Sequence, residues 1–151
     1  MPQLKLLSET TEVPAEASAT EIMRELVSAG ALEMTTHYRE GRIRSLHWRM
    51  PVHGAQAHFV MPARESGVYQ VLASRYKTFV SEERKRELWE QAHRIAWRHL
   101  LKWTQAQLAI IRTGVLEPGE LFAGFLVEPG SSGQTLFQAF VAARGIEDKV
   151  Q

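Results

Sequence analysis

The sequence predicts an α+β fold in which a three-stranded antiparallel meander packs against a helical layer. Three successive runs in the first half of the chain alternate apolar with polar residues, as half-buried strands do. A later stretch, residues 81–112, contains neither glycine nor proline and carries two apolar rows at helical spacing, which is typical of a long central helix. Because the chain has 151 residues and no long linker, we expect one domain over residues 18–145.

The N-terminal segment, residues 1–17, is polar and acidic and contains two prolines, so we expect a mobile arm there. Ser18 and Glu21 match a capping box, which predicts that the first helix begins at this serine. Gly30 suits the position that follows the C-terminus of a helix. Residues 146–151 are expected to form a C-terminal tail.

The three alternating runs predict the strands of the meander. They cover residues 32–38, 45–50 and 56–61. A three-residue loop at 39–41 places Met34 opposite Leu46, whereas a two-residue loop places Met34 opposite His47 and mixes the two faces of the sheet. We therefore predict the three-residue loop, followed by a four-residue loop at 51–54.

Four helices are predicted after the meander. They cover residues 66–76, residues 81–112, a short segment that opens at Glu117–Glu120, and a last segment that carries Leu136–Val141 and ends before Gly145. Ser81 is a suitable N-cap for the long helix, and Gly114 stops it. His99 falls within an apolar row of this helix, so we predict a core histidine there.

The composition is that of an ordinary soluble globular protein, with 44% hydrophobic and 23% charged residues. The absence of cysteine excludes disulfides, thiolate nucleophiles and zinc ribbons. No apolar run approaches the ~20 residues that a membrane span needs, and the N-terminus does not resemble a signal peptide. We therefore expect a cytoplasmic protein with no membrane partner.

The formal net charge of +1 hides an uneven distribution of charge. Residues 41–64 and residues 91–116 contain no acidic residue, and each stretch carries four lysines or arginines. Such polarisation steers polyanions toward one surface. Internal ion pairs between the basic middle and the acidic ends of the chain produce the same pattern, so both interpretations stay open.

Arginine outnumbers lysine by thirteen to five, and guanidinium groups match phosphates and stack on bases. We therefore predict contact with DNA or RNA through a basic hairpin tip and a ridge on the long helix. The predicted nucleic-acid-binding residues are Arg39, Arg42, Arg44, Arg49, Arg94, Arg98 and Lys102. No zinc-finger spacing, RNP-like pattern or KH-type loop accompanies them.

The alternative is a protein-binding or oligomerisation module, for example a defence or counter-defence factor, that uses its amphipathic helices. Three of the four tryptophans fall on the long helix, where aromatic residues usually belong to the core. Trp89 lies closest to the charged N-terminal turns of that helix, so it is the predicted anchor for a partner.

The polar face of the meander provides a third hypothesis. With the loops predicted above, Glu33 lies opposite His47, and His47 lies opposite His58, at the ~5 Å spacing of cross-strand neighbours. One carboxylate and two imidazoles are able to bind a divalent metal or to transfer protons near neutral pH. Because histidine is also common on a solvated strand face, we favour that interpretation. We assign no catalytic residue, metal or cofactor, and we lean toward a protein that is not an enzyme.

The C-terminal half carries a recognisable combination of segments. QAHRIAWRHLLKWTQAQLAIIRTGVLEPGELFAGFLV, residues 91–127, is followed by GQTLF at 133–137. A Trp-rich helix, a short apolar helix and a Gly-x-Thr-Leu-aromatic element in this order resemble small uncharacterised phage and prophage proteins. The resemblance implies an accessory protein of a phage or mobile element, and it transfers no catalytic or binding residues. Our leading hypothesis is that this accessory protein is not an enzyme and contacts nucleic acid.

Overall fold

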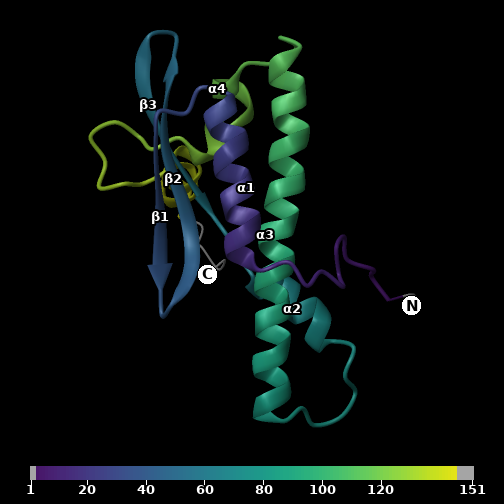
Figure 1. Cartoon of the computed structure of the whole chain (residues 1–151). Helices are drawn as coiled ribbons and strands as arrows, with labels where there is room; N and C mark the ends of the chain where they lie inside the picture. The colour runs from purple at the N-terminus through teal and green to yellow at the C-terminus, as the bar shows by residue number, and fades with distance from the viewer. Residues whose placement is uncertain (1–2, 146–151) are drawn as a thin grey trace.

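The computed structural model describes residues 3–145 as an antiparallel sheet with the two longest helices on one of its faces, which confirms the predicted α+β class (Figure 1). The elements are α1 (Ala15–Ser28), β1 (Glu33–Arg39), β2 (Arg42–Val52), β3 (Ala55–Pro62), α2 (Ser66–Ala73), α3 (Glu82–Arg112), α4 (Pro118–Leu121), the 3₁₀ turn η1 (Ala123–Phe125) and α5 (Leu136–Ala143). Within the described residues, no helix combines the length and the apolar character that crossing a membrane requires. The predicted tail at 146–151 lies outside the described residues.

The first hairpin turns through two residues instead of the predicted three. Arg39 pairs with Arg42, and the two loop residues, Glu40 and Gly41, have φ values of 54° and 73°. Positive φ at both positions gives a two-residue loop whose twist matches that of the flanking strands. The prediction of a loop at 39–41 was therefore wrong.

A bulge in β2 explains why the alternation of residues pointed to the longer loop. β2 has one extra residue, Arg44, between the partners of His37 and Tyr38. A two-residue loop without a bulge would set apolar residues of β1 opposite polar residues of β2. The extra residue shifts the pairing by one position, so that apolar residues face each other again and Met34 lies opposite Trp48.

The second hairpin is also tighter than predicted. Its loop consists of His53 and Gly54, with φ values of 49° and 80°, and not of four residues. Both strands consequently extend further toward the turn, and every cross-strand partner shifts by two positions. His47 therefore lies opposite Val60 rather than His58.

The first helix, α1, begins at Ala15, with Pro14 at its N-cap. Proline fits this place because its fixed φ suits a helix start and its missing N–H would have had no partner there. Ser18 is consequently an internal residue with a buried side chain, so the prediction that it caps the helix was wrong.

The segment that precedes α1 runs along α3. The Nε2 atom of Gln91 donates hydrogen bonds to the carbonyl oxygens of Glu9 and Thr11, at 2.8 and 3.1 Å. His99, predicted to be a core residue, is partly exposed and contacts the carbonyl oxygen of Leu7 instead. These contacts locate the segment, while its mobility in solution stays a prediction.

The long helix α3 confirms the predicted central helix, and Ser81 caps it by accepting a hydrogen bond from the backbone N–H of Arg84. The middle of α3 packs into the main core between α1 and the sheet, where Trp97 is fully buried. Its first turns form a smaller second core with α2. The buried residues of this second core are Leu72, Leu88, Ala92 and Ile95.

The C-terminal part returns to the sheet after α4 and η1. Leu126 bridges to Phe59 of β3, and this bridge extends the sheet by a short step on that side. The last helix, α5, has no buried residue and leaves Leu136, Phe137 and Phe140 exposed by 38%, 48% and 52%.

Candidate functional site

A groove of about 1120 Å³ lies between the tip of the first hairpin, the connection from β3 to α2, and the first turns of α3. We call it the arginine groove because its lining in the described chain includes five arginines. They are Arg39, Arg42, Arg44, Arg64 and Arg86. Three glutamates also line the groove, and Trp89 and Tyr38 add flat aromatic surface.

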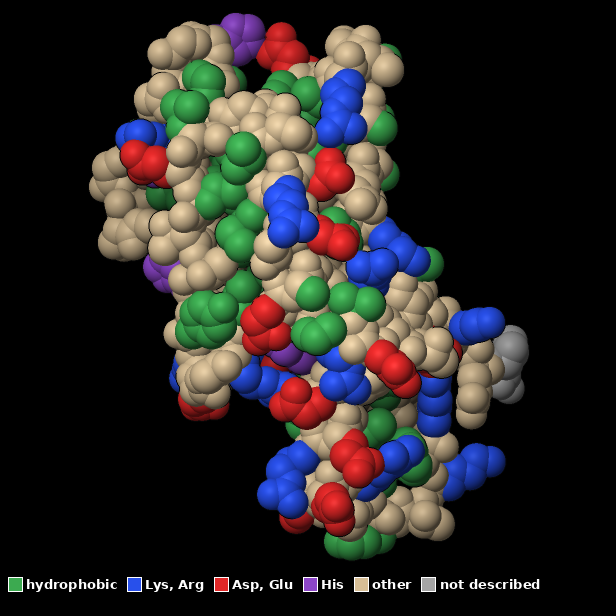
Figure 2. Space-filling view, viewed as in Figure 1, with side chains coloured by type: hydrophobic (Ala, Val, Ile, Leu, Met, Phe, Trp, Pro, Cys, Tyr) green, Lys and Arg blue, Asp and Glu red, His purple; other side chains and the backbone are tan. Residues whose placement is uncertain are grey.

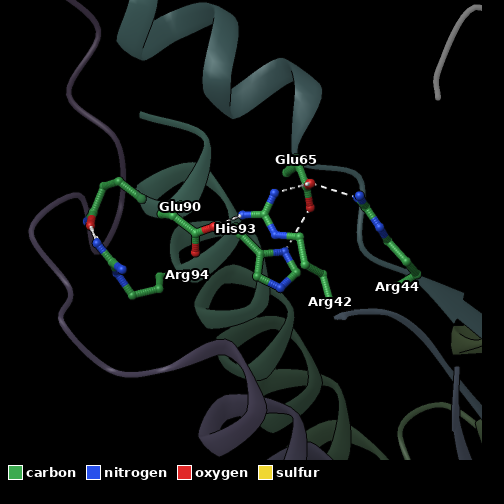
Figure 3. Close-up of polar contacts among 7 residues, drawn as sticks. Arg42, Arg44, Glu65, Glu90, His93 and Arg94 are labelled. Carbon is green, nitrogen blue, oxygen red and sulfur yellow. Dashed lines mark hydrogen bonds and ion pairs between the residues drawn. The ribbon is translucent and has the colours of Figure 1, made fainter. Parts of the chain in front are cut away.

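Glu65 joins the walls of this groove (Figure 3). It stands at the start of α2, and only 5% of its side chain is exposed. Nη1 of Arg44 donates to Oε1 of Glu65 at 2.7 Å, and Nη1 of Arg42 lies 3.8 Å from the same oxygen. Nδ1 of His93 lies 2.8 Å from Oε2. One buried carboxylate therefore connects β2 and α2 to α3.

The pKa of Glu65 lies below its ordinary value although burial by itself raises it. The hydrogen bond from His93 has the largest opposing effect, and the charges of His93, Arg44 and Arg42 add to it. Glu65 is consequently a carboxylate at neutral pH, and the Nδ1–H of His93 donates to it. The Nε2 atom of His93 is buried and has no hydrogen-bond partner among the described residues.

The groove arginines fall into two groups. Arg42 and Arg44 are held by Glu65, and Arg42 also bonds Oε1 of the exposed Glu90 at 2.8 Å. The other three form no ion pair with any residue in 3–145, so no described carboxylate neutralises their charge. These are Arg39, Arg64 and Arg86.

The aromatic wall of the groove is supported from behind. The ring of Trp89 stacks on Tyr69 of α2, with the ring centroids 3.9 Å apart and the planes within 5°. Trp89 remains partly exposed while its position is fixed by this stacking. A preorganised aromatic face beside guanidinium groups is suited to a flat, anionic ligand.

The structure brings together only part of the predicted nucleic-acid-binding set. Arg39, Arg42 and Arg44 line the arginine groove, as does Trp89, the predicted anchor. The other residues of the set lie elsewhere: Arg49 on the sheet beside Glu33, Arg94 against Gln91, Arg98 at 3.7 Å from Glu21 of α1, and Lys102 exposed on α3. Arg94 nevertheless lines a further hollow, of about 300 Å³, together with Gly41 and Arg42 of the first hairpin. The predicted tip and ridge therefore meet at Arg94, whereas Arg98 and Lys102 line neither hollow.

A second hollow, of about 270 Å³, lies on the sheet and contains Glu33, His47 and His58. Their predicted cross-strand row was wrong, because Arg49 stands between Glu33 and His58 and forms an ion pair with Glu33. His47 stacks on His37 instead, with the ring centroids 3.7 Å apart, and burial, followed by the proximity of His37, lowers the pKa of His47. In residues 3–145 no group of three His, Cys, Asp or Glu side chains is arranged to hold a metal ion.

Sequence reasoning missed four residues of the site. They are Glu65, His93, Arg64 and Arg86. One signal was available, because Glu65 is the first carboxylate after the stretch 41–64, in which all charges are positive. A single acid at the end of a basic stretch is a natural internal partner for it. The burial of His93 carried no comparable signal, since its neighbours along the helix are both apolar and charged.

No known protein family, curated protein or solved structure shows significant similarity to this chain. The resemblance of its C-terminal half to phage proteins therefore stays a prediction.

Proposed function

We propose that the arginine groove binds nucleic acid. The observation that carries the proposal is the presence, in one hollow, of three arginines without an ion pair among the described residues and of a partly exposed, stacked tryptophan. Guanidinium groups bind phosphates in a bidentate manner, and an indole ring stacks on bases. The groove therefore offers both kinds of contact that a nucleotide chain uses.

The charge around the groove favours local binding rather than binding along an extended surface. Side chains of both signs are interspersed over the lower part of the face in Figure 2, where α2 and the first turns of α3 lie. Arg42 and Arg44 contribute little net positive charge, because Glu65 neutralises much of it while holding the two guanidinium groups in place. The unpaired arginines consequently supply most of the attraction for phosphate.

Replacing Arg64 and Arg86 together by glutamate is expected to weaken the binding of a labelled oligonucleotide about tenfold or more at ~50 mM salt, because two positive charges are reversed. These two residues are better targets than Arg42 and Arg44, whose removal would leave Glu65 with His93 as its only described partner. Fluorescence anisotropy at ~50 and ~200 mM salt measures the effect, and the affinity of the unmodified chain should fall steeply between the two conditions.

The matched control reverses two charges on α3 outside the groove, with Arg98→Glu and Lys102→Glu. This variant should retain nearly the full affinity of the unmodified chain. An equal loss in both variants contradicts the placement of the site in the groove. No binding by the unmodified chain at the lower salt concentration contradicts nucleic-acid binding altogether.

A second candidate function, protein binding, is favoured by α5. Its exposed side chains, Leu136, Phe137 and Phe140, are large and apolar, and such side chains grouped on one helix mark contact surfaces. This helix is a better candidate anchor than Trp89, because the ring of Trp89 already has a stacking partner.

A further inference from the structure

The outer edge of β1 is free. The strand order β1-β2-β3 gives β1 a neighbour on one side only, and no other strand within residues 3–145 pairs with its other side. None of the seven residues of β1 is buried. The opposite edge of the sheet is partly covered, because Leu126 bridges to Phe59 there. An open edge of this length is a template for a further strand.

The features that usually block pairing at an edge are missing from β1. The strand contains no proline and no lysine. The bulge of the sheet lies in β2, at Arg44, so β1 itself keeps a regular backbone. Its formally charged residues lie only at the two ends of the strand, Glu33 at the N-terminal end and Arg39 at the C-terminal end.

We infer that this edge pairs with β1 of a second copy of the chain, antiparallel about a two-fold axis at Thr36. Because a two-fold axis makes each contact occur twice, Glu33 of each copy then lies opposite Arg39 of the other. The remaining pairs are Met34 with Tyr38, Thr35 with His37, and Thr36 with itself. Opposite charges that face each other across strands stabilise the pairing.

This register is specified by the ends of the strand. A slip of the two strands by two residues sets Glu33 opposite His37, or Arg39 opposite Thr35, and both charge pairs are lost. Glu33 remains accessible, with 64% of its side chain exposed although it contacts Arg49. Arg39 is exposed and has no ion pair among the described residues.

Apolar contacts add to the backbone pairing. Tyr38 is 55% exposed, and in the proposed register its ring covers Met34 of the second copy, which removes apolar surface from water. On the face in Figure 2, hydrophobic side chains reach the surface along the sheet. The result is one continuous sheet of six strands, because each copy contributes three. A two-fold axis perpendicular to the sheet keeps α1 and α3 of both copies, which cover one face in each (Figure 1), on the same face. The pairing does not depend on nucleic-acid binding.

Sedimentation equilibrium of the full chain between about 5 and 500 µM tests the inference, since a dimer of this kind dissociates on dilution. Arg39→Glu and Glu33→Arg each set like charges opposite each other twice, and each is expected to weaken dimerisation at least ~tenfold. The double variant, which carries both substitutions, restores opposite charges at both positions and should recover most of the affinity.

Glu40→Arg is the matched control, because it makes the same charge change in the turn, outside the strand. It should leave the dimer intact, and circular dichroism melting checks that every variant is folded. A chain that stays monomeric over the whole concentration range overturns the inference. A dimer that is insensitive to both single substitutions, or that the double variant does not restore, overturns it equally.

Discussion

Replacing Glu65 with alanine is expected to lower the free energy of unfolding by about 3 kcal/mol. The side chain is 5% exposed, accepts hydrogen bonds from Arg44 and His93, and lies 3.8 Å from Arg42. Its removal therefore leaves two donors without their acceptor and removes a negative charge beside Arg42. Urea unfolding followed by circular dichroism measures the loss as a lower midpoint with an unchanged slope.

Glu90→Ala is the control for this substitution, because Glu90 contacts Arg42 with a side chain that is 58% exposed. An exposed ion pair of this kind is worth less than about 1 kcal/mol. Equal effects of the two substitutions would contradict the central place of Glu65 in the network.

The stability of the protein should also fall in acid, in two steps. The pKa of His47 in the folded state lies below its ordinary 6.5. Below pH 6.5 the unfolded chain therefore binds a proton at His47 that the folded chain does not yet bind. The folded state consequently loses stability until the pH reaches the pKa of His47 in the folded state. The pKa of Glu65 lies below its ordinary 4.5, so its contribution is complete above that value and is lost as the pH falls through its pKa in the folded state. Urea unfolding at a series of pH values measures both, and Glu65→Gln should flatten only the lower step. A lower step of undiminished size in that variant would assign the acid sensitivity to other carboxyl groups.

Replacing Trp97 with alanine is expected to lower the free energy of unfolding by about 4 kcal/mol, the usual loss for a buried tryptophan. Its side chain is fully buried at the centre of the main core, and its Nε1–H donates to the carbonyl oxygen of Ile43 at 3.3 Å. The cavity and the unpaired carbonyl both contribute. For a chain of this length the loss corresponds to a decrease of roughly 10 °C in the melting temperature, which calorimetry measures.

Trp97→Phe separates the two contributions, because phenylalanine keeps most of the ring volume and loses the hydrogen bond. It should cost clearly less than the alanine substitution. A loss as large as that of Trp97→Ala would mean that the contact with Ile43, and not the packing, dominates.

The sequence predicted the fold class and the long helix because both depend on local patterns. The stretch 81–112 has helical periodicity throughout and a serine cap at its start, and neither signal needs a tertiary contact. The predicted register of the first hairpin was wrong for a specific reason. The bulge at Arg44 adds one residue to β2, so a two-residue loop brings the apolar residues of both strands to the same face of the sheet.

The site was predicted only in part, since its contacts join distant segments. Three arginines of the hairpin and Trp89 were identified from residue type and position, and they share one groove. The contact between Glu65 and His93 spans 28 positions and brings the start of α2 against α3, which no periodicity in either segment encodes. The position of Arg98 outside the groove depended likewise on a contact between distant segments, its ion pair with Glu21 of α1.

Because α3 is one uninterrupted helix, it holds the regions at its two ends at a fixed distance from each other. Trp89 faces the arginine groove near one end of the helix, and the exposed side chains of Val115 and Leu116 follow its other end. At 1.5 Å per residue, the helix holds these two regions about 35 Å apart along a single rigid axis. A ligand in the groove and a partner at the far end would therefore be kept at a fixed separation, set by the number of helical turns between them.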